Sequence, residues 1–175
     1  EESFMTVKEN GELDFGGRAM LTGERIYRIY NDAYAYNAEV VVADEIITTA
    51  DELRSILLAK EESGSCTDYI VLGNDILNAG EYAHTRTDEF QFSGTLDGRG
   101  HAISGIELKD YGLIRQLSAL GEIKNLAIIN AKSTLTDKGT ILCGWNYGKI
   151  SDVFISGTAE GPSGAVIACI GSIEN

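Results

Sequence analysis

The chain has 175 residues, 43% of them hydrophobic, and carries a formal net charge of −13. A chain of this length can bury one substantial core beside a small appendage, and an acidic charge of this size argues against nucleic acid and anionic membranes as partners. No apolar run comes near the length of a membrane-spanning helix, so we expect no membrane insertion.

The N-terminal segment, residues 1–47, has strand character around residues 3–8, 26–30 and 38–43. We expect a small β appendage here, or the tail of a preceding domain. The chain begins at Glu1 without a methionine, and we expect it to be a piece of a longer protein. Further domains of the same parent chain are therefore among its expected partners.

A helix is predicted directly after this segment. Thr49 and Glu52 have the spacing of a capping box, in which each side chain hydrogen-bonds the backbone of the other residue. An apolar stripe follows at Leu53, Ile56 and Leu57, and a Ser-Gly pair then ends the helix. A repeat protein needs such a cover at its end because an open first coil would expose its core.

After the helix, Tyr69–Leu72 is a short aromatic and aliphatic run that is typical of a strand. Residues 78–92 are mostly polar, and we expect a loop there.

The second half of the chain repeats itself. The pattern Gly-x-Ile-x-(Asn/Asp)-apolar occurs at residues 121–126 and 148–153, starts again at Gly171, and has a looser copy at residues 100–106. The isoleucines of these copies are 20, 27 and 23 residues apart, at Ile103, Ile123, Ile150 and Ile173. A second glycine series runs beside the first, at Gly112, Gly139 and Gly164.

Two series with a common, slightly variable period indicate stacked strands, each unable to bury its apolar face alone. Glycines are expected to supply positive-φ corners between the strands. We therefore predict a mainly β protein: a right-handed parallel β-helix (solenoid) over residues 48–175, with an N-terminal capping α-helix and a truncated last coil, behind the small β appendage of residues 1–47. A β-sandwich is the alternative, but it does not explain the register of the two series.

Two segments resemble bacterial β-helix modules that carry the GLUG motif. Residues 92–103 are similar to the F-x-G-T-L-D-G-x-G-H-x-I opening of such modules, and residues 144–153 to their G-x-N-x-G-x-I-x-N-C core, with Val153 where cysteine is common. The likeness covers about residues 48–175. It implies an exported, adhesin-like bacterial protein, or a module flanking an immunoglobulin-A metallopeptidase, and it implies no active site.

No constellation of catalytic, metal-binding or cofactor-binding residues is recognisable. Asp97 and His101 would suit a polysaccharide lyase, but Asp97 is better explained as a turn residue that binds backbone amides. A glycosidase needs two carboxylates across one cleft, whereas the candidate acids are scattered, at Asp97, Asp110, Asp137 and Asp152. The histidines, His84 and His101, lie in no zinc motif, and Gly98-Arg99-Gly100 lacks the spacing of a dinucleotide loop.

Trp145, Asn146 and Tyr147 are the candidate ligand-binding residues, because exposed aromatic rings on a solenoid can stack on sugar rings. The alternative is that these rings cover a corner of a coil. The three cysteines cannot form a complete disulfide framework, and whether Cys143 and Cys169 pair stays open.

We therefore expect a non-catalytic β-helix module of a surface or secreted bacterial protein, located outside the cell or on its surface. Its role would be adhesive or that of a spacer, with a glycan or a protein on a host or cell surface as partner. The alternatives are an accessory module of a secreted hydrolase or metallopeptidase and, third, a polysaccharide lyase or glycosidase.

Overall fold

A computed structural model describes residues 6–7, 13–14, 23–30, 35–85, 90–109, 111–134, 140–160 and 172–174. The chain divides into two compact units, residues 1–42 and residues 43–175. Each unit is described by itself. The predicted mainly β composition is confirmed, and the strands of the larger unit form parallel sheets.

The smaller unit contains two antiparallel strand pairs. β1 (Thr6–Val7) pairs with β2 (Leu13–Asp14), and β3 (Gly23–Tyr30) pairs with β4 (Ala35–Val42) along its full length. The unit ends at residue 42 rather than at the predicted residue 47, because β5 (Glu45–Ile47) pairs in parallel with β7 (Tyr69–Leu72) of the larger unit.

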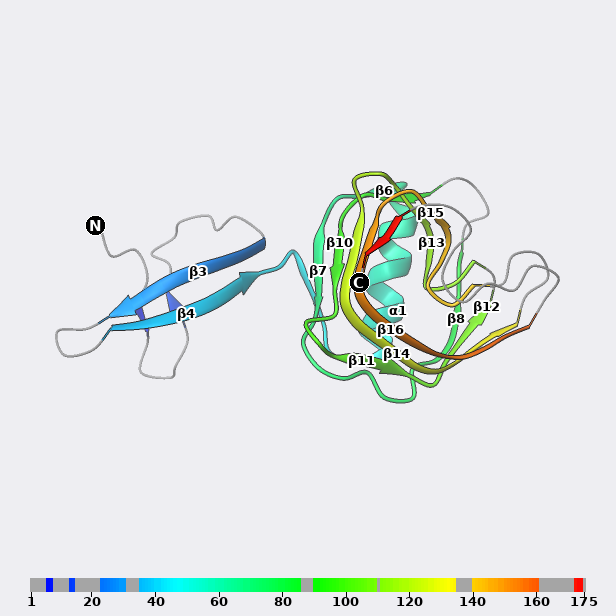
Figure 1. The fold of residues 1–175 in the computed structure, drawn as a ribbon, viewed down its shortest axis with the longest axis horizontal. Helices are drawn as coiled ribbons and strands as arrows, with labels where there is room; N and C mark the ends of the chain where they lie inside the picture. Colours follow the sequence, from blue (N-terminus) through cyan, green and yellow to red (C-terminus); the bar gives the residue numbers. More distant parts are fainter. Residues whose placement is uncertain are drawn as a thin grey trace. The chain divides into compact units, whose positions relative to one another are not determined.

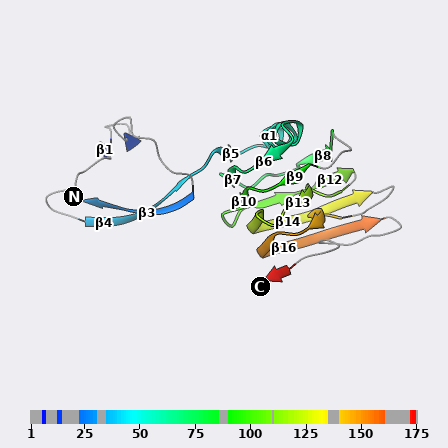
Figure 2. The same ribbon diagram turned by 90° about the horizontal axis from the view of Figure 1, so that it is seen from above.

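Two parallel sheets make up the larger unit (Figures 1 and 2). The strands along the first sheet follow the order of the sequence: β5, β7, β10 (Thr95–Asp97), β14 (Glu122–Thr134), β16 (Lys149–Glu160) and β17 (Ser172–Glu174). Three further strands extend this sheet: β8 (Gly80–Ala83), β11 (Ala102–Ser104) and β12 (Ile106–Lys109). The second sheet also keeps sequence order, with β6 (Ser65–Cys66), β9 (Gln91–Phe92), β13 (Ile114–Leu117) and β15 (Cys143–Asn146).

From β5 to β16 the chain therefore alternates between the two sheets, and each visit adds one strand to the second sheet and one to three strands to the first. The prediction of a polar loop over residues 78–92 was wrong, because β8 and β9 lie within it. These strands have four and two residues, and each buries one aromatic side chain, Tyr82 or Phe92. A single buried aromatic residue among polar neighbours does not produce the alternating pattern from which a strand is predicted.

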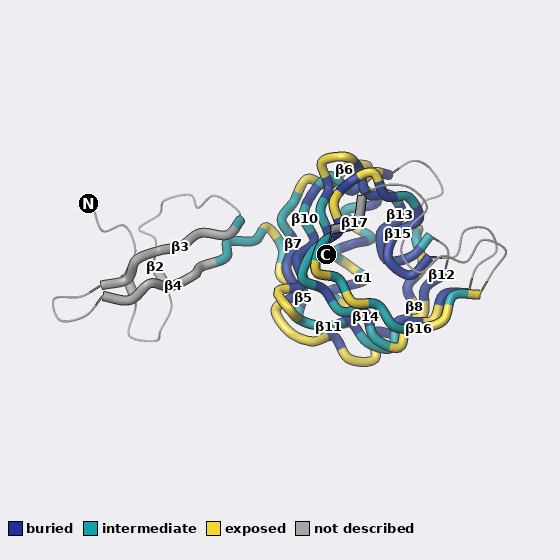
Figure 3. Tube along the Cα trace, in the orientation of Figure 1, coloured by how far each residue is buried: buried dark blue, intermediate teal, exposed yellow. Residues whose placement is uncertain are grey.

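The core lies inside the curl of the strands, where buried residues line both sheets (Figure 3). One column of side chains runs across the first sheet, with exposed fractions of 2% or less at Ile70, Leu96, Ile123 and Ile150. The predicted equivalence of Ile103 with Ile123 was wrong, because Ile103 pairs with Ile128 and Leu96 pairs with Ile123. The equivalence of Ile123, Ile150 and Ile173 is confirmed by their register.

The second glycine series is also offset from the register of the strands. Ile114 pairs with Cys143, 29 positions later, whereas the spacing from Gly112 to Gly139 predicted 27. Gly139 and Gly164 themselves lie outside the described residues.

The prediction of positive-φ glycine corners is confirmed at Gly100, Gly105 and Gly112, with φ values of 83°, 64° and 80°, but not at the two full copies of the Gly-x-Ile repeat. Gly121 and Gly148 both lack positive φ, but a Cβ on Gly148 would lie only 2.2 Å from the carbonyl oxygen of Gly121. A Cβ on Gly121 would lie 2.4 Å from the carbonyl oxygen of Phe92. These glycines are therefore required for close stacking of backbone on backbone.

The polar residue of the repeat forms the corner instead. Asn125 and Asp152 have φ values of 52° and 51°, and Asn and Asp adopt this left-handed conformation more readily than other non-glycine residues. In β14, Asn125 is an extra residue that shifts the alternation of inward and outward side chains. Ile123 and Leu126, three positions apart, are therefore both buried. Asn130, with φ 53°, repeats this effect further along β14.

The predicted helix is confirmed as α1 (Ala50–Glu62), together with the capping box of Thr49 and Glu52. Its Leu53 and Leu57 are buried in the core, and it lies at the end of the stack that holds β5 (Figure 2). Lys60 forms ion pairs of 2.7 Å with both Glu45 and Asp68. These ion pairs connect the last turn of the helix to β5 and to the residue that precedes β7. No helix among the described residues is long and apolar enough to cross a membrane.

Candidate functional site

The three predicted ligand-binding residues lie at the end of β15, where the alternation of the strand separates them. Trp145 is half-buried and Tyr147 is 48% exposed, and both line a pocket on the outer face of the second sheet. Asn146 is 1% exposed, and its Oδ1 accepts a hydrogen bond of 2.9 Å from the backbone N–H of Gly148. The structure therefore brings the two aromatic rings together and places Asn146 in the interior, where it supports the turn that follows.

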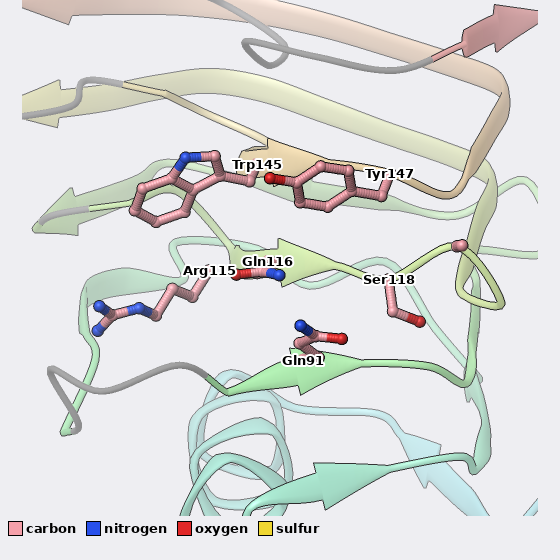
Figure 4. Close-up of a pocket in the computed structure, with 7 residues that line it drawn as sticks. Gln91, Arg115, Gln116, Ser118, Trp145 and Tyr147 are labelled. Atoms are coloured by element: carbon pink, nitrogen blue, oxygen red, sulfur yellow. The ribbon is translucent and has the colours of Figure 1, made fainter.

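The pocket is open to solvent and has a volume of about 740 Å³. It spans three adjacent strands, β9, β13 and β15, and the turn after β13. Figure 4 shows Trp145 and Tyr147 side by side along β15, with Gln116 and Ser118 on the neighbouring strand and Gln91 on the next. Its lining residues are Gln91, Arg115, Gln116, Ser118, Ala119, Trp145 and Tyr147.

The Trp145 ring is held in place by Tyr111. The two rings stack with their centroids 5.4 Å apart and their planes 23° apart. The guanidinium carbon of Arg115 lies 4.3 Å from the centroid of the same Tyr111 ring, as in a cation–π contact. Gly144 leaves room for Tyr111, because a Cβ there would lie 3.3 Å from the Tyr111 Cβ. Such a buttress reduces the entropy that Trp145 loses when a ligand binds.

Uncharged polar groups predominate in the pocket. No carboxylate is among its lining residues, and Arg115, its one charged residue, is only 6% exposed. The Ser118 and Ser93 hydroxyls hydrogen-bond each other at 2.8 Å. Within the described part of the chain, the side-chain amides of Gln91 and Gln116 have no hydrogen-bond partner, so both remain available to a ligand.

The two glutamines were missed by the sequence analysis. They lie 25 residues apart, and Gln116 pairs with Trp145, 29 residues further on. Because the register between the strands of the second sheet could not be obtained from the glycine spacing, nothing in the sequence connected these positions.

Asp97 has a structural role that agrees with its predicted place in a turn. Its side chain is buried, and its oxygens accept hydrogen bonds from the Tyr69 hydroxyl at 2.7 Å, the Arg99 N–H at 2.8 Å and the Asn125 amide at 3.0 Å. Burial raises the pKa of this carboxyl, but the three hydrogen bonds and the nearby charge of Lys124 outweigh it, and the pKa lies below its ordinary value.

His101 and Asp75 form an exposed pair at one end of β11. The Nδ1 of His101 lies 3.1 Å from the Asp75 carboxylate, which also accepts a hydrogen bond of 3.0 Å from the backbone N–H of Ala102. These hydrogen bonds lower the pKa of Asp75.

His84 forms the second histidine contact, which is buried beside the last turn of α1. Its Nδ1 lies 3.1 Å from a carboxylate oxygen of Glu61, and its Nε2 lies 2.8 Å from the carbonyl oxygen of Gly112. Both side chains are at most 5% exposed. The cluster joins α1 to the segment after β8.

Among the described residues, no group of three or more His, Cys, Asp and Glu side chains could hold a metal ion. Of the four acids named from the sequence, Asp110 and Asp137 lie outside the described residues, as does Cys169. Cys66 and Cys143 are buried, and burial raises the pKa of the Cys66 thiol. Within the described part of the chain, the pocket around Trp145 is therefore the candidate site for a ligand.

Comparison with known proteins identifies one partial similarity. The chain is 42% identical over 81 residues to halomucin from Haloquadratum walsbyi, a match that covers 43% of this chain and 1% of halomucin. The chain thus spans about 1% of the length of this relative. No family model matches the sequence, and no solved structure matches it.

Proposed function

We propose that the chain is a non-catalytic module of a surface or secreted protein and that it binds glycans through the pocket around Trp145 and Tyr147. The observation that carries the proposal is the pair of outward aromatic rings, one of them buttressed by Tyr111, in an open pocket with uncharged polar groups. Aromatic faces stack on the apolar faces of sugar rings, while amides and hydroxyls meet sugar hydroxyls.

The scaffold of this module is proposed to be a right-handed parallel β-helix. Support comes from the two parallel sheets, which the chain visits alternately and extends in sequence order. The handedness follows from the strong preference of parallel crossover connections for the right-handed form. The resemblance to GLUG-motif modules over about residues 48–175 points to the same scaffold.

An extracellular or cell-surface location is proposed on the same basis. The GLUG-like segments and the partial similarity to halomucin support it. A rigid stack of strands would then hold the pocket away from the rest of the parent protein. Weak contacts between a glycan and several strands of the stack can add to one another.

The non-catalytic part of the proposal rests on the state of the acidic side chains. Asp97 is buried and its oxygens are occupied by hydrogen bonds, and the pocket lining offers no pair of carboxylates. Release of unsaturated sugars from polygalacturonate by the purified protein would contradict this part and favour a lyase.

A glycan array, followed by titration calorimetry with the glycans that bind, tests the binding function. We expect Trp145→Ala to weaken binding by roughly tenfold or more, as is typical of a central aromatic contact. Phe154→Ala is the matched control, because Phe154 is 61% exposed on β16 of the other sheet. Tyr147→Ala should also weaken binding while the protein stays folded, because its ring is exposed. Equal affinities for the Trp145→Ala and Phe154→Ala variants would contradict the site.

A further inference from the structure

The outward side chains of the second sheet form two rows that run across the strands. Gln116 pairs with Trp145, and because Leu117 pairs with both Phe92 and Asn146, Gln91 lies opposite Gln116. The first row is therefore Gln91, Gln116 and Trp145. The second row consists of Ser93, Ser118 and Tyr147, with the two serines joined by their hydrogen bond. Figure 4 shows members of both rows on successive strands.

We propose that the ligand is an uncharged oligosaccharide that lies across the strands, so that successive sugar units contact Trp145, Gln116 and Gln91. This inference rests on the proposed glycan-binding function and adds the direction and the charge of the glycan.

The direction follows from where the available groups are. Neighbouring strands lie about 4.8 Å apart, so crossing the sheet brings a ligand to a new polar side chain on each strand. Along β15 the pocket offers the Tyr147 ring beside Trp145, and Tyr111 is stacked against the Trp145 ring. A glycan that extends past these rings gains further polar contacts by crossing to Gln116 on β13 and Gln91 on β9.

The absence of charge on the proposed oligosaccharide is inferred from the residues that line the pocket. The side-chain amides of Gln91 and Gln116 each donate and accept, which suits sugar hydroxyls. A sulfate or carboxylate group would need an accessible cation, whereas Arg115 is 6% exposed and packs on the Tyr111 ring. The net charge of −13 further disfavours the approach of a polyanion.

The experiment uses oligosaccharides of one to four sugar units. Glucan, mannan and galactan oligomers form the neutral set, and galacturonate oligomers of equal length form the anionic set. Trp145 is the only tryptophan, so its fluorescence reports binding at this pocket directly, and calorimetry measures binding to the variant that lacks it. The variants are Gln91→Ala, Trp145→Ala and the control Glu81→Ala, an exposed residue of β8.

We expect the affinity for a neutral oligomer to rise with its length. Gln91→Ala should lower the affinity for the longest oligomer by roughly threefold, the value of one neutral hydrogen bond, and should leave the affinity for one sugar unit unchanged. Trp145→Ala should weaken binding at every length, and Glu81→Ala at none.

A Gln91→Ala effect that is the same at every length, or no effect at all, would overturn the proposed direction while glycan binding stands. Tighter binding of galacturonate oligomers would overturn the proposed charge. If the wild-type protein binds none of the probes, the glycan-binding function fails and this inference fails with it.

Discussion

Gly148 lies against the backbone of the preceding layer, and the space it leaves is too small for any side chain. A Cβ there would lie 2.2 Å from the Gly121 carbonyl oxygen and 2.4 Å from that of Ser118. Backbone atoms cannot move aside as the end of a flexible side chain can. The spacing of two layers at this point therefore depends on glycine.

We predict that Gly148→Ala destabilises the protein by roughly 3 kcal/mol, the upper part of the range for overpacking. Gly100→Ala is the control, because Gly100 has φ 83° but a Cβ added there would meet no atom within 4 Å. That substitution should cost only about 1 kcal/mol of backbone strain. Chemical denaturation measures both, and an equal loss of unfolding free energy would show that stacking is not the reason for glycine at position 148.

Asp97 makes the stability of the fold depend on pH. Its pKa is lower in the folded protein than its ordinary value of 3.8, so the unfolded chain binds the proton more readily. The stabilisation is therefore present above pH 3.8 and is lost as the pH falls through the lower folded-state pKa.

We predict that Asp97→Asn lowers the unfolding free energy at pH 7, because the charge-assisted hydrogen bonds from Tyr69 and Arg99 are weakened. The loss of stability between about pH 5 and pH 2 should be less steep in the variant than in the wild type. Denaturant unfolding at a series of pH values measures both effects. Parallel pH profiles for the two proteins would contradict the role of this carboxylate.

At the scale of elements, the buried contact of His84 with Glu61 joins the end of α1 to the segment that follows β8. Removing the His84 side chain leaves the Glu61 carboxylate buried without this contact, and such a loss typically costs several kcal/mol. We predict that His84→Ala lowers the unfolding free energy by roughly 3 kcal/mol. The double variant Glu61→Leu/His84→Phe should be more stable than His84→Ala, because it removes both polar groups and keeps the volume.

Thermal and denaturant unfolding of the two variants test this prediction, with Lys132→Ala as an exposed control. A double variant less stable than His84→Ala would show that the contacts of the Glu61 carboxylate, rather than the cost of burying it without His84, dominate.

The elements that local sequence specifies were predictable. The helix and its capping box depend on residues three or four positions apart, and Tyr69–Leu72 is a continuous run of strand-forming residues. β8 and β9 were not predictable, because each has only one buried aromatic residue. Counting between glycines gave the register of β14, β16 and β17 but not that of β13 and β15 in the second sheet.

The candidate site shows the same division. Trp145 and Tyr147 were found because they are close together along one strand, whereas Gln91 and Gln116 reach them only through the pairing of β9, β13 and β15. Asn146 was assigned to the site with its neighbours Trp145 and Tyr147, but the structure places both Trp145 and Asn146 within β15. Alternation within a strand then places its side chain in the core.

At the scale of the whole molecule, the chain divides into a unit of residues 1–42 and a unit of residues 43–175. The buried hydrophobic cluster of the described residues runs from Ile47 to Ile150. The first layer of this core is completed by β5 and α1, which supply Ile47, Leu53 and Leu57.

This arrangement predicts opposite outcomes for two truncations of similar size. Removal of residues 1–42 should leave the thermal midpoint of the larger unit and its glycan affinity unchanged, because these residues form a compact unit of their own. Removal of residues 1–62 also deletes β5 and α1 and exposes the apolar side chains beneath them, which at about 25 cal/mol per Å² is enough to unfold a marginally stable domain. Circular dichroism on heating, with the fluorescence of Trp145, distinguishes the two results. A shorter truncation that already unfolds the protein would show that residues 1–42 belong to the same cooperative unit.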